Sequence, residues 1–213
     1  MRTKKDINSI KIELLTHYGK PETELNFNNL YELLVAVMLS AQCTDKRVNL
    51  ITPSLFKEYP KVSNLAKANL GSVKELIKSC NFYNNKAKNL ISMAKSVMSE
   101  FDGQIPLNRD SLMSLAGVGR KTANVVMIEY AGANFMAVDT HVFRVSHRLG
   151  LSSAKTTEKT EEDLTKAFKT DLNYLHQAMV LFGRYTCKAT KPQCYTCFLN
   201  TFCKSKDKLV QIE

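Results

Sequence analysis

The chain has 213 residues, of which 44% are hydrophobic and 23% charged, so it is long enough for a hydrophobic core and too apolar for a disordered protein. Lysine and arginine outnumber acidic residues by 30 to 20, giving a net charge of +10, which attracts a polyanion such as nucleic acid or merely aids solubility. No apolar run approaches the roughly 18 residues of a membrane helix, and no signal peptide is recognisable. These features predict a soluble protein of the reducing cytoplasm.

Apolar residues recur at helical spacing along almost the whole chain, and no stretch alternates convincingly with period two. The sequence therefore predicts an all-α fold. Residues 30–39 are apolar on every side, which indicates a central buried helix. A further helix is predicted from Asn85, as its N-cap, to Asp102-Gly103. The isolated Cys43 and Cys80 are expected to be buried thiols.

The segment 115–122, of sequence LAGVGRKT, predicts a tight hairpin between two helices. One helix is expected to end near Leu115, and the next to run from about Arg120 to Ala131, with Gly132 placed to stop it. The glycines Gly117 and Gly119 leave backbone N–H groups uncovered at a helix N-terminus, where they can bind one phosphate. Such a contact positions a duplex without reading its sequence. The alternative is an ordinary turn.

Lys121 lies in the first turn of that second helix, beside Arg120. We expect the positive end of the helix dipole and the neighbouring guanidinium both to disfavour the ammonium. A lysine with some neutral amine is a nucleophile that can form a Schiff base. The alternative interpretation is that Lys121 contacts phosphate as a cation.

The segment 138–142, VDTHV, places Asp139 between apolar residues and ahead of a predicted helix through Arg144. A lone aspartate at this position is most often an N-cap. A carboxylate held near a lysine amine could also stabilise a cationic sugar transition state and move protons. His141 either lines a pocket or packs against the protein.

Two more helices are predicted before the C-terminus. Thr160 with Asp163 resembles a capping box for a helix running to about Lys169. The last long helix should bury one face, formed by Leu172, Leu175, Met179 and Phe182.

The last thirty residues carry four cysteines in the spacing C-x6-C-x2-C-x5-C, at Cys187, Cys194, Cys197 and Cys203. Four thiolates this close in sequence can hold Zn²⁺ or an iron–sulfur cluster. Zinc sites usually pair two short knuckles, and only the middle pair is that close here, which favours the larger cluster. Two disulfides are the remaining alternative, disfavoured because nothing in the chain indicates secretion.

Three of these motifs, namely residues 115–126, residues 138–142 and the four-cysteine loop, resemble the endonuclease III family of bifunctional DNA glycosylases in the helix–hairpin–helix superfamily. Residues 39–45, LSAQCTD, extend the resemblance. It covers nearly the whole chain in the same order. The three motifs together are specific, whereas the hairpin alone would not be.

The resemblance implies two helical lobes with a DNA cleft between them. One lobe is a six-helix barrel over about residues 23–133, with the helix–hairpin–helix near 109–128. The other joins residues 1–22 to 134–213 and holds a [4Fe–4S] cluster on the four cysteines of loop 187–203. That cluster is expected to be structural. The implied partner is duplex DNA carrying a damaged pyrimidine or an abasic site, and a monomer is expected.

The resemblance also implies roles for individual residues. Lys121 would be the nucleophile and Asp139 the catalytic carboxylate of a glycosylase that also cleaves the strand 3′ to the abasic site by β-elimination. Gln42 matches the residue that fills the gap left by a flipped base; its alternative is a helix-terminal amide. The remaining DNA contacts implied are Gly117, Gly119, Arg120, Lys188 and Lys191.

Two positions depart from the family pattern. Ala116 stands where proline is usual, which should loosen the hairpin by about 0.4–1 kcal/mol through the entropy of the unfolded chain. Phe82 stands where an intercalating leucine would be expected. An aromatic ring can also wedge between bases, although a core phenylalanine is the alternative.

Three other classes of protein remain open at this level. A monofunctional glycosylase of the superfamily would lack the lysine at position 121 and typically carry an extra C-terminal domain. A non-enzymatic DNA-binding protein would use Lys121 only as a phosphate contact. An electron carrier would space its cysteines differently. The compact length suggests a bacterial-type enzyme that works at the nucleoid.

Overall fold

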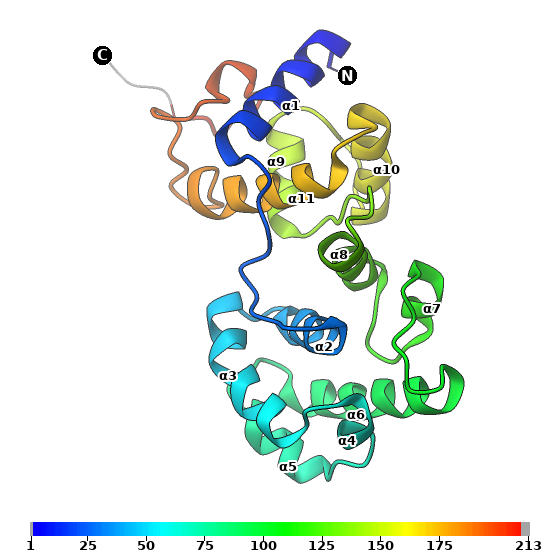
Figure 1. Ribbon diagram of the computed structural model, residues 1–213. Helices are drawn as coiled ribbons and strands as arrows, with labels where there is room; N and C mark the ends of the chain where they lie inside the picture. The colour runs from blue at the N-terminus through cyan, green and yellow to red at the C-terminus, as the bar shows by residue number, and fades with distance from the viewer. Residues whose placement is uncertain (1, 210–213) are drawn as a thin grey trace. The chain divides into compact units, whose positions relative to one another are not determined.

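The computed structural model describes residues 2–209, and within them it contains helices and turns but no strand (Figure 1). The predicted all-α fold is therefore confirmed. The chain divides into two compact units. One is continuous, Glu24–Ala131, and the other combines Met1–Thr23 with Gly132–Glu213. No helix of the described part combines the length and the apolar character needed to cross a bilayer.

The continuous unit holds seven of the described helices, which are α2 (Leu30–Ser40), α3 (Asp45–Glu58), α4 (Val62–Ala66), α5 (Leu70–Ile77), α6 (Tyr83–Glu100), α7 (Arg109–Ser114) and α8 (Arg120–Ala131). Helix α2 is its centre and packs against α3, α6 and α8. Every α2 residue from Leu33 to Leu39 is buried, which confirms the predicted central helix. The burial of each such large apolar side chain stabilises the fold by roughly 1.5–3 kcal/mol.

The discontinuous unit holds α1 (Lys4–Tyr18), α9 (Thr140–Arg148), α10 (Thr157–Phe168), α11 (Leu172–Leu181), a π-helical turn η1 (Phe182–Thr186) and a 3-10 turn η2 (Asn200–Phe202). Although α1 and α11 lie far apart in the sequence, they pack side by side (Figure 1). Ile10 and Leu14 of α1 are fully buried in a core shared with α9, α10 and α11. The predicted buried face of the last long helix is confirmed, since Leu172, Leu175, Met179 and Phe182 all belong to this core.

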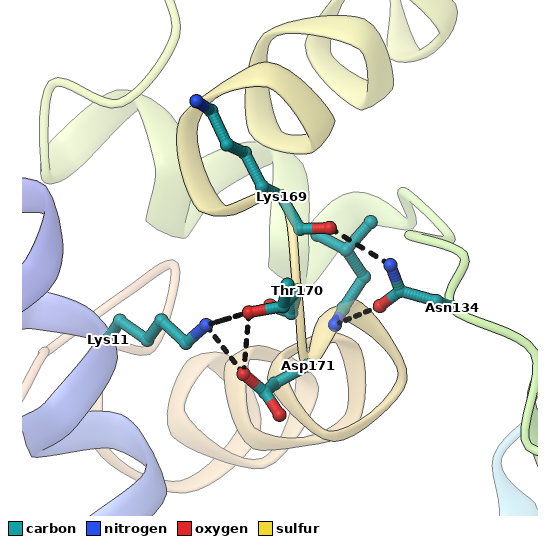
Figure 2. A network of polar contacts seen from close by, with 6 residues as sticks. Lys11, Asn134, Lys169, Thr170 and Asp171 are labelled. Atoms are coloured by element: carbon teal, nitrogen blue, oxygen red, sulfur yellow. Dashed lines mark hydrogen bonds and ion pairs between the residues drawn. The ribbon is translucent and has the colours of Figure 1, made fainter.

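A polar network secures α1 to the turn between α10 and α11 (Figure 2). The Lys11 ammonium donates to the Thr170 carbonyl at 3.0 Å and to its hydroxyl at 2.7 Å, and pairs with Asp171 at 2.6 Å. The Thr170 hydroxyl in turn donates to Asp171 at 2.9 Å. The Asn134 amide spans the same turn, because it donates to the Lys169 carbonyl and accepts from the Leu172 N–H, both at 2.9 Å. Asn134, which is distant in sequence, thereby caps the start of α11, while Lys11 holds α1 against the two residues that precede it.

Two predicted helix starts are wrong. Helix α6 begins at Tyr83, with Phe82 rather than Asn85 at its N-cap. Helix α10 begins at Thr157, because the hydroxyl of Thr156 accepts from the Lys159 N–H and caps the helix earlier. Thr160 is buried inside α10, and its hydroxyl donates back to the Thr156 carbonyl at 2.9 Å.

Candidate active site and cysteine loop

The hairpin between α7 and α8 has the predicted bounds, with α7 ending at Ser114 and α8 spanning Arg120–Ala131. Gly117 has φ +77°, and a Cβ there would lie 2.8 Å from the Asn89 side chain of α6. Glycine is therefore required at 117 by both backbone conformation and packing. Gly119 has open space where a Cβ would lie. The second glycine thus leaves the backbone at the N-terminus of α8 open to a ligand such as phosphate.

Lys121 is the second residue of α8, and its side chain is exposed. Within the described residues, no hydrogen bond or ion pair holds its ammonium. The next turn of α8 is buried at Ala123, Asn124, Val125 and Val126, so a rigid, core-anchored helix carries the exposed lysine. A nucleophile needs this combination of a fixed backbone and a free amine.

Asp139 is the N-cap of α9, and its Oδ1 accepts from the Val142 N–H at 2.8 Å. The structural role considered for this residue is therefore real. The cap engages only one carboxylate oxygen, and within the described residues Oδ2 accepts no hydrogen bond. A catalytic role is compatible with the cap, because the cap fixes the rotamer while Oδ2 remains available. Val138 is 4% exposed and Val142 is fully buried, so the carboxylate is held between two core residues.

His141 is half-buried in the first turn of α9, and its Nδ1 lies 3.2 Å from Nη2 of Arg144. A guanidinium can only donate, so Nδ1 accepts this bond and any ring proton sits on Nε2. A Cβ added to Gly183 would come within 2.8 Å of the His141 Cβ, so this histidine packs closely on η1. Lining of a pocket by His141 stays a prediction.

Gln42 and Phe82 lie in the two turns that flank α3–α5, and both have left-handed backbones, with φ 54° and φ 57°. The left-handed conformation costs a non-glycine residue roughly 1–2 kcal/mol. Both side chains are exposed, Phe82 by 63%. An aromatic ring with this exposure is not the core phenylalanine considered as an alternative. Strained, exposed residues of this kind are typical of functional sites.

The sequence did not point to two residues that hold these turns. The Asn81 amide donates to the Gln42 carbonyl at 2.9 Å. The Lys86 ammonium donates to the carbonyls of Leu39 and Ala41, each at 2.7 Å. These contacts join positions about forty residues apart, and no local pattern could have revealed them.

Cys43 and Cys80 are not isolated, because their Sγ atoms lie 3.5 Å apart across the same two turns. Both are free thiols, and Cys80 is 2% exposed. Burial and the hydrogen bond with Cys43 raise the pKa of Cys80 to about 11. The buried thiol therefore stays protonated and packs as a small apolar side chain.

The cysteine loop, residues 187–203, brings all four predicted ligands to one pocket, where Cys187, Cys194, Cys197 and Cys203 are lining residues together with Phe182 and Asn200. All four are free thiols. Burial raises the pKa of the Cys197 thiol, and the other three cysteines add to the effect through their charges. Nowhere in residues 2–209 do three histidine, cysteine or acidic side chains converge as they would around a single metal ion. Four soft sulfur donors spread around a common pocket fit the chemistry of a polynuclear iron–sulfur cluster.

Two arginines of α9 hold the start of this loop, and they were also missed. Arg144 donates to the Gly183 carbonyl at 2.7 Å and to the Cys187 carbonyl at 3.1 Å. Arg148 donates to the Lys188 carbonyl at 2.7 Å and reaches the Cys187 Sγ at 3.5 Å. Their i, i+4 spacing puts them on one face of α9, which is the signal that could have found them. Lys188 and Lys191 are exposed on the loop.

Comparison with known proteins defines the class. The chain belongs to the HhH-GPD superfamily of base excision DNA repair proteins, whose family model matches residues 35–170. This result confirms the resemblance found in the hairpin and in the segments around it.

The particular relatives are endonucleases III. The chain is 42% identical over 207 residues to endonuclease III of Haemophilus influenzae, covering 93% of this chain and 97% of that protein. It is 44% identical over 191 residues to endonuclease III of Bacillus subtilis, covering 88% of this chain and 86% of that protein. A solved structure of a trapped endonuclease III–DNA covalent intermediate superimposes with a TM-score of 0.92 at 40% identity, covering 96% of this chain and 97% of that one. The protein is thus a base-excision-repair DNA glycosylase of the endonuclease III type, with AP lyase activity.

Proposed function

We propose that this enzyme excises oxidised or ring-damaged pyrimidines from duplex DNA and cleaves the strand through a Schiff base on Lys121. The observation that carries the proposal is the exposed ammonium of Lys121, which has no hydrogen-bond or ion-pair partner among residues 2–209, on the core-anchored start of α8 directly after the Gly117–Gly119 turn. A damaged pyrimidine stacks and pairs poorly, so flipping it out of the duplex costs less than flipping a normal base. Selection for damage thereby begins before any chemistry.

The chemistry follows from the two proposed catalytic residues. The amine of Lys121 attacks C1′ of the flipped nucleotide, and the bond from C1′ to the base breaks; its electron pair leaves with the base, which takes up a proton from water. Asp139 stabilises the positive charge that develops on the sugar and accepts a proton from the attacking amine. The sugar ring opens to an imine with Lys121.

Strand cleavage is the second half of the proposed reaction. The imine acidifies the C2′ proton. Water takes up this proton, and the electron pair of the C2′–H bond forms a double bond as the 3′ phosphate leaves by β-elimination. Water then hydrolyses the imine and frees Lys121 for another cycle. No redox partner is needed, because substitution, β-elimination and hydrolysis leave the overall oxidation level unchanged.

DNA contacts are assigned to the residues that position the duplex. The open backbone at Gly119, with Arg120 beside it, suits one phosphate. Lys188 and Lys191 are exposed cations suited to further phosphate contacts. Gln42 and Phe82 would fill the space that the flipped nucleotide vacates. The proposed partner is thus duplex DNA with a damaged pyrimidine or an abasic site, bound by a monomer.

We assign a [4Fe–4S] cluster to the four cysteines of the loop, where it would cross-link residues 187–203. The support is the set of four sulfur donors around one pocket and the arginine contacts that pre-arrange Cys187. No step of the proposed reaction passes through the cluster. A place at the nucleoid in the cytoplasm follows from the proposed substrate.

Borohydride trapping tests the proposed nucleophile on a duplex that contains one oxidised pyrimidine. Native protein should give a covalent protein–DNA adduct, and Lys121→Ala should give none while still binding the duplex. Lys88→Ala, which removes another exposed lysine of the same unit, should trap like native protein. Base release without any trapped adduct would instead indicate a monofunctional glycosylase, and the proposal for Lys121 would fail.

A further inference from the structure

Two turns of the continuous unit, which carry Gln42 and Phe82, are held by side-chain contacts that have no part in the proposed chemistry. The first turn, residues 41–44, follows α2 and carries Gln42. The second turn, residues 78–82, precedes α6 and carries Phe82. Both carry an exposed side chain on a left-handed backbone. Side chains of the second turn and of the following first turn of α6 contact the first turn and the end of α2.

Lys86 makes the strongest of these contacts. Helix α2 ends at Ser40, and Ala41 turns out of the helix with φ −57° and ψ 112°. The last carbonyls of a helix have no partner within it and form the negative end of its dipole. The half-buried Lys86 places its ammonium on two of them, the carbonyls of Leu39 and Ala41. These two charge-assisted hydrogen bonds thus fix the backbone at the end of α2 and directly before Gln42.

Asn81 makes the second contact. Its amide donates to the Gln42 carbonyl at 2.9 Å, so the peptide that follows Gln42 is held by the residue that precedes Phe82. The thiols of Cys43 and Cys80, at 3.5 Å, close the third contact. Each turn therefore helps to fix the other, although 37 residues separate Cys43 from Cys80.

We propose that Lys86 and Asn81 are positioning residues, which hold Gln42 and Phe82 in the geometry that enters the duplex. This inference rests on the proposed function, in which those two side chains fill the gap left by a flipped nucleotide. A wedge must be rigid to displace a stacked base, because a mobile side chain loses conformational freedom on insertion. Lys86 and Asn81 supply that rigidity before DNA binds.

The test uses Lys86→Met, which keeps most of the aliphatic stem and removes the ammonium, and Asn81→Ala. A duplex with 2-aminopurine opposite a stable abasic-site analogue reports insertion as a rise in fluorescence at saturating protein. Both variants should lose most of that rise. Single-turnover excision on a lesion duplex should slow by about tenfold or more in Lys86→Met, which loses two charge-assisted hydrogen bonds, and by less in Asn81→Ala, which loses one neutral hydrogen bond. Lys86→Arg should restore both readouts.

Matched controls separate positioning from other roles. Lys88→Met and Asn84→Ala alter exposed residues of the same helix and should behave like native protein. If Lys86 contacted phosphate instead, Lys86→Met would reduce the slope of log affinity against log salt by about 0.9. That result, or native fluorescence and native excision in Lys86→Met, would overturn the proposal. Loss of activity with unchanged fluorescence would also overturn it.

Failure of the proposed function would look different. Lys121→Ala should keep the 2-aminopurine signal and lose only the trapped adduct. If native protein gave the signal but no adduct, the Schiff-base chemistry would be wrong while Lys86 and Asn81 could still be tested by fluorescence. If native protein gave an adduct but no signal, Gln42 and Phe82 would not enter the duplex, and the positioning roles would fall.

Discussion

The two units of this enzyme are stabilised in different ways. The continuous unit is organised around α2, whose residues from Leu33 to Leu39 are all buried, so apolar burial holds it. The discontinuous unit also has an apolar core, but it has to bring back a distant N-terminal helix and to order a loop of residues 187–203. It does so with specific polar contacts, from Lys11 to the α10–α11 turn and from Arg144 and Arg148 to the loop.

The difference predicts where each unit is vulnerable. Burial is spread over many residues, so one lost side chain leaves most of it intact. Within the cysteine loop only Leu199 is buried, and four ligands would share a single cluster. Loss of one ligand should therefore affect the whole loop, and the largest effect of a single substitution should be found there.

Cys197→Ser is expected to abolish the cluster and to unfold the loop. Cys197 lines the shared pocket and contributes to the hydrophobic packing of its unit, and a serine hydroxyl is a poor ligand for iron. Iron and sulfide content, together with visible absorption of the purified protein, should fall to background. Far-UV circular dichroism should retain most of the helical signal, because the helices of the continuous unit do not depend on the loop.

Cys43→Ser is the matched control, since it alters a free thiol of the other unit. It should keep full iron and sulfide content. A Cys197→Ser protein that retained its iron would contradict the assignment of the loop as the cluster site. If both variants lost iron, the cysteines outside the loop would have to take part, which the contact between Cys43 and Cys80 gives no reason to expect.

The sequence predicts those helices whose ends and burial depend on neighbouring residues alone. The bounds of α8 follow from glycines on either side, and the burial of α2 follows from its continuous apolar residues. The predicted start of α10 is wrong because threonine can cap a helix equally well at 156 and at 160. Only the burial of Thr160 decides between the two positions. The predicted start of α6 is wrong because the N-cap position is occupied by Phe82, whose side chain cannot accept a capping hydrogen bond.

The candidate site likewise contains residues that local sequence motifs predict and residues that only long-range contacts reveal. Lys121, Asp139 and the four cysteines could be singled out because each lies in a compact motif, and the catalytic roles of Lys121 and Asp139 stay predictions. Asn81 and Lys86 could not be found, because their partners lie about forty residues away, at the end of α2 and in the turn after it. Their contacts arise from packing of α6 against α2, which no local pattern shows.

Removal of the contact between α1 and the α10–α11 turn should have a smaller effect. Lys11→Met breaks the pair with Asp171 and leaves Ile10 and Leu14 in the core, so we expect a loss of about 1 kcal/mol, near the upper end for an exposed ion pair. The free energy of unfolding from denaturant titration measures it. Lys5→Met, an exposed lysine of the same helix, should lose much less.

The same contact should depend on pH in a defined direction. The hydrogen bond from Lys11, with a further one from Thr170, lowers the pKa of Asp171 below its ordinary value. A carboxyl with a depressed folded pKa stabilises the fold fully above its unfolded pKa, about 3.9, and loses that contribution as the pH falls through the folded pKa. The stability difference between native protein and Asp171→Asn should therefore be constant above about pH 5 and shrink below pH 4. A difference that grew on acidification would contradict this sign.

Ala116→Pro should produce the smallest change, and it should be stabilising. Leu115, the preceding residue, has φ −75° and ψ 140°, which is the extended conformation that a following proline requires. The turn is closed by the Val118 N–H, which donates to the Leu115 carbonyl at 3.1 Å and is unaffected by the change. Proline at 116 should thus raise the free energy of unfolding by about 0.4–1 kcal/mol, because it restricts the unfolded chain.

The sign of this effect tests the geometry of the hairpin more closely than its size does. Ala123→Pro is the contrasting variant, because Ala123 lies inside α8 and its N–H donates to the Gly119 carbonyl at 2.9 Å. It should destabilise the protein by about 3 kcal/mol or more. If Ala116→Pro were also destabilising, the hairpin would need a backbone at 116 that proline cannot adopt. If Ala116→Pro stabilised the protein and left trapping by Lys121 unchanged, alanine at 116 would make the turn less rigid without affecting its function. The turn would then be defined by Gly117 and its packing on Asn89.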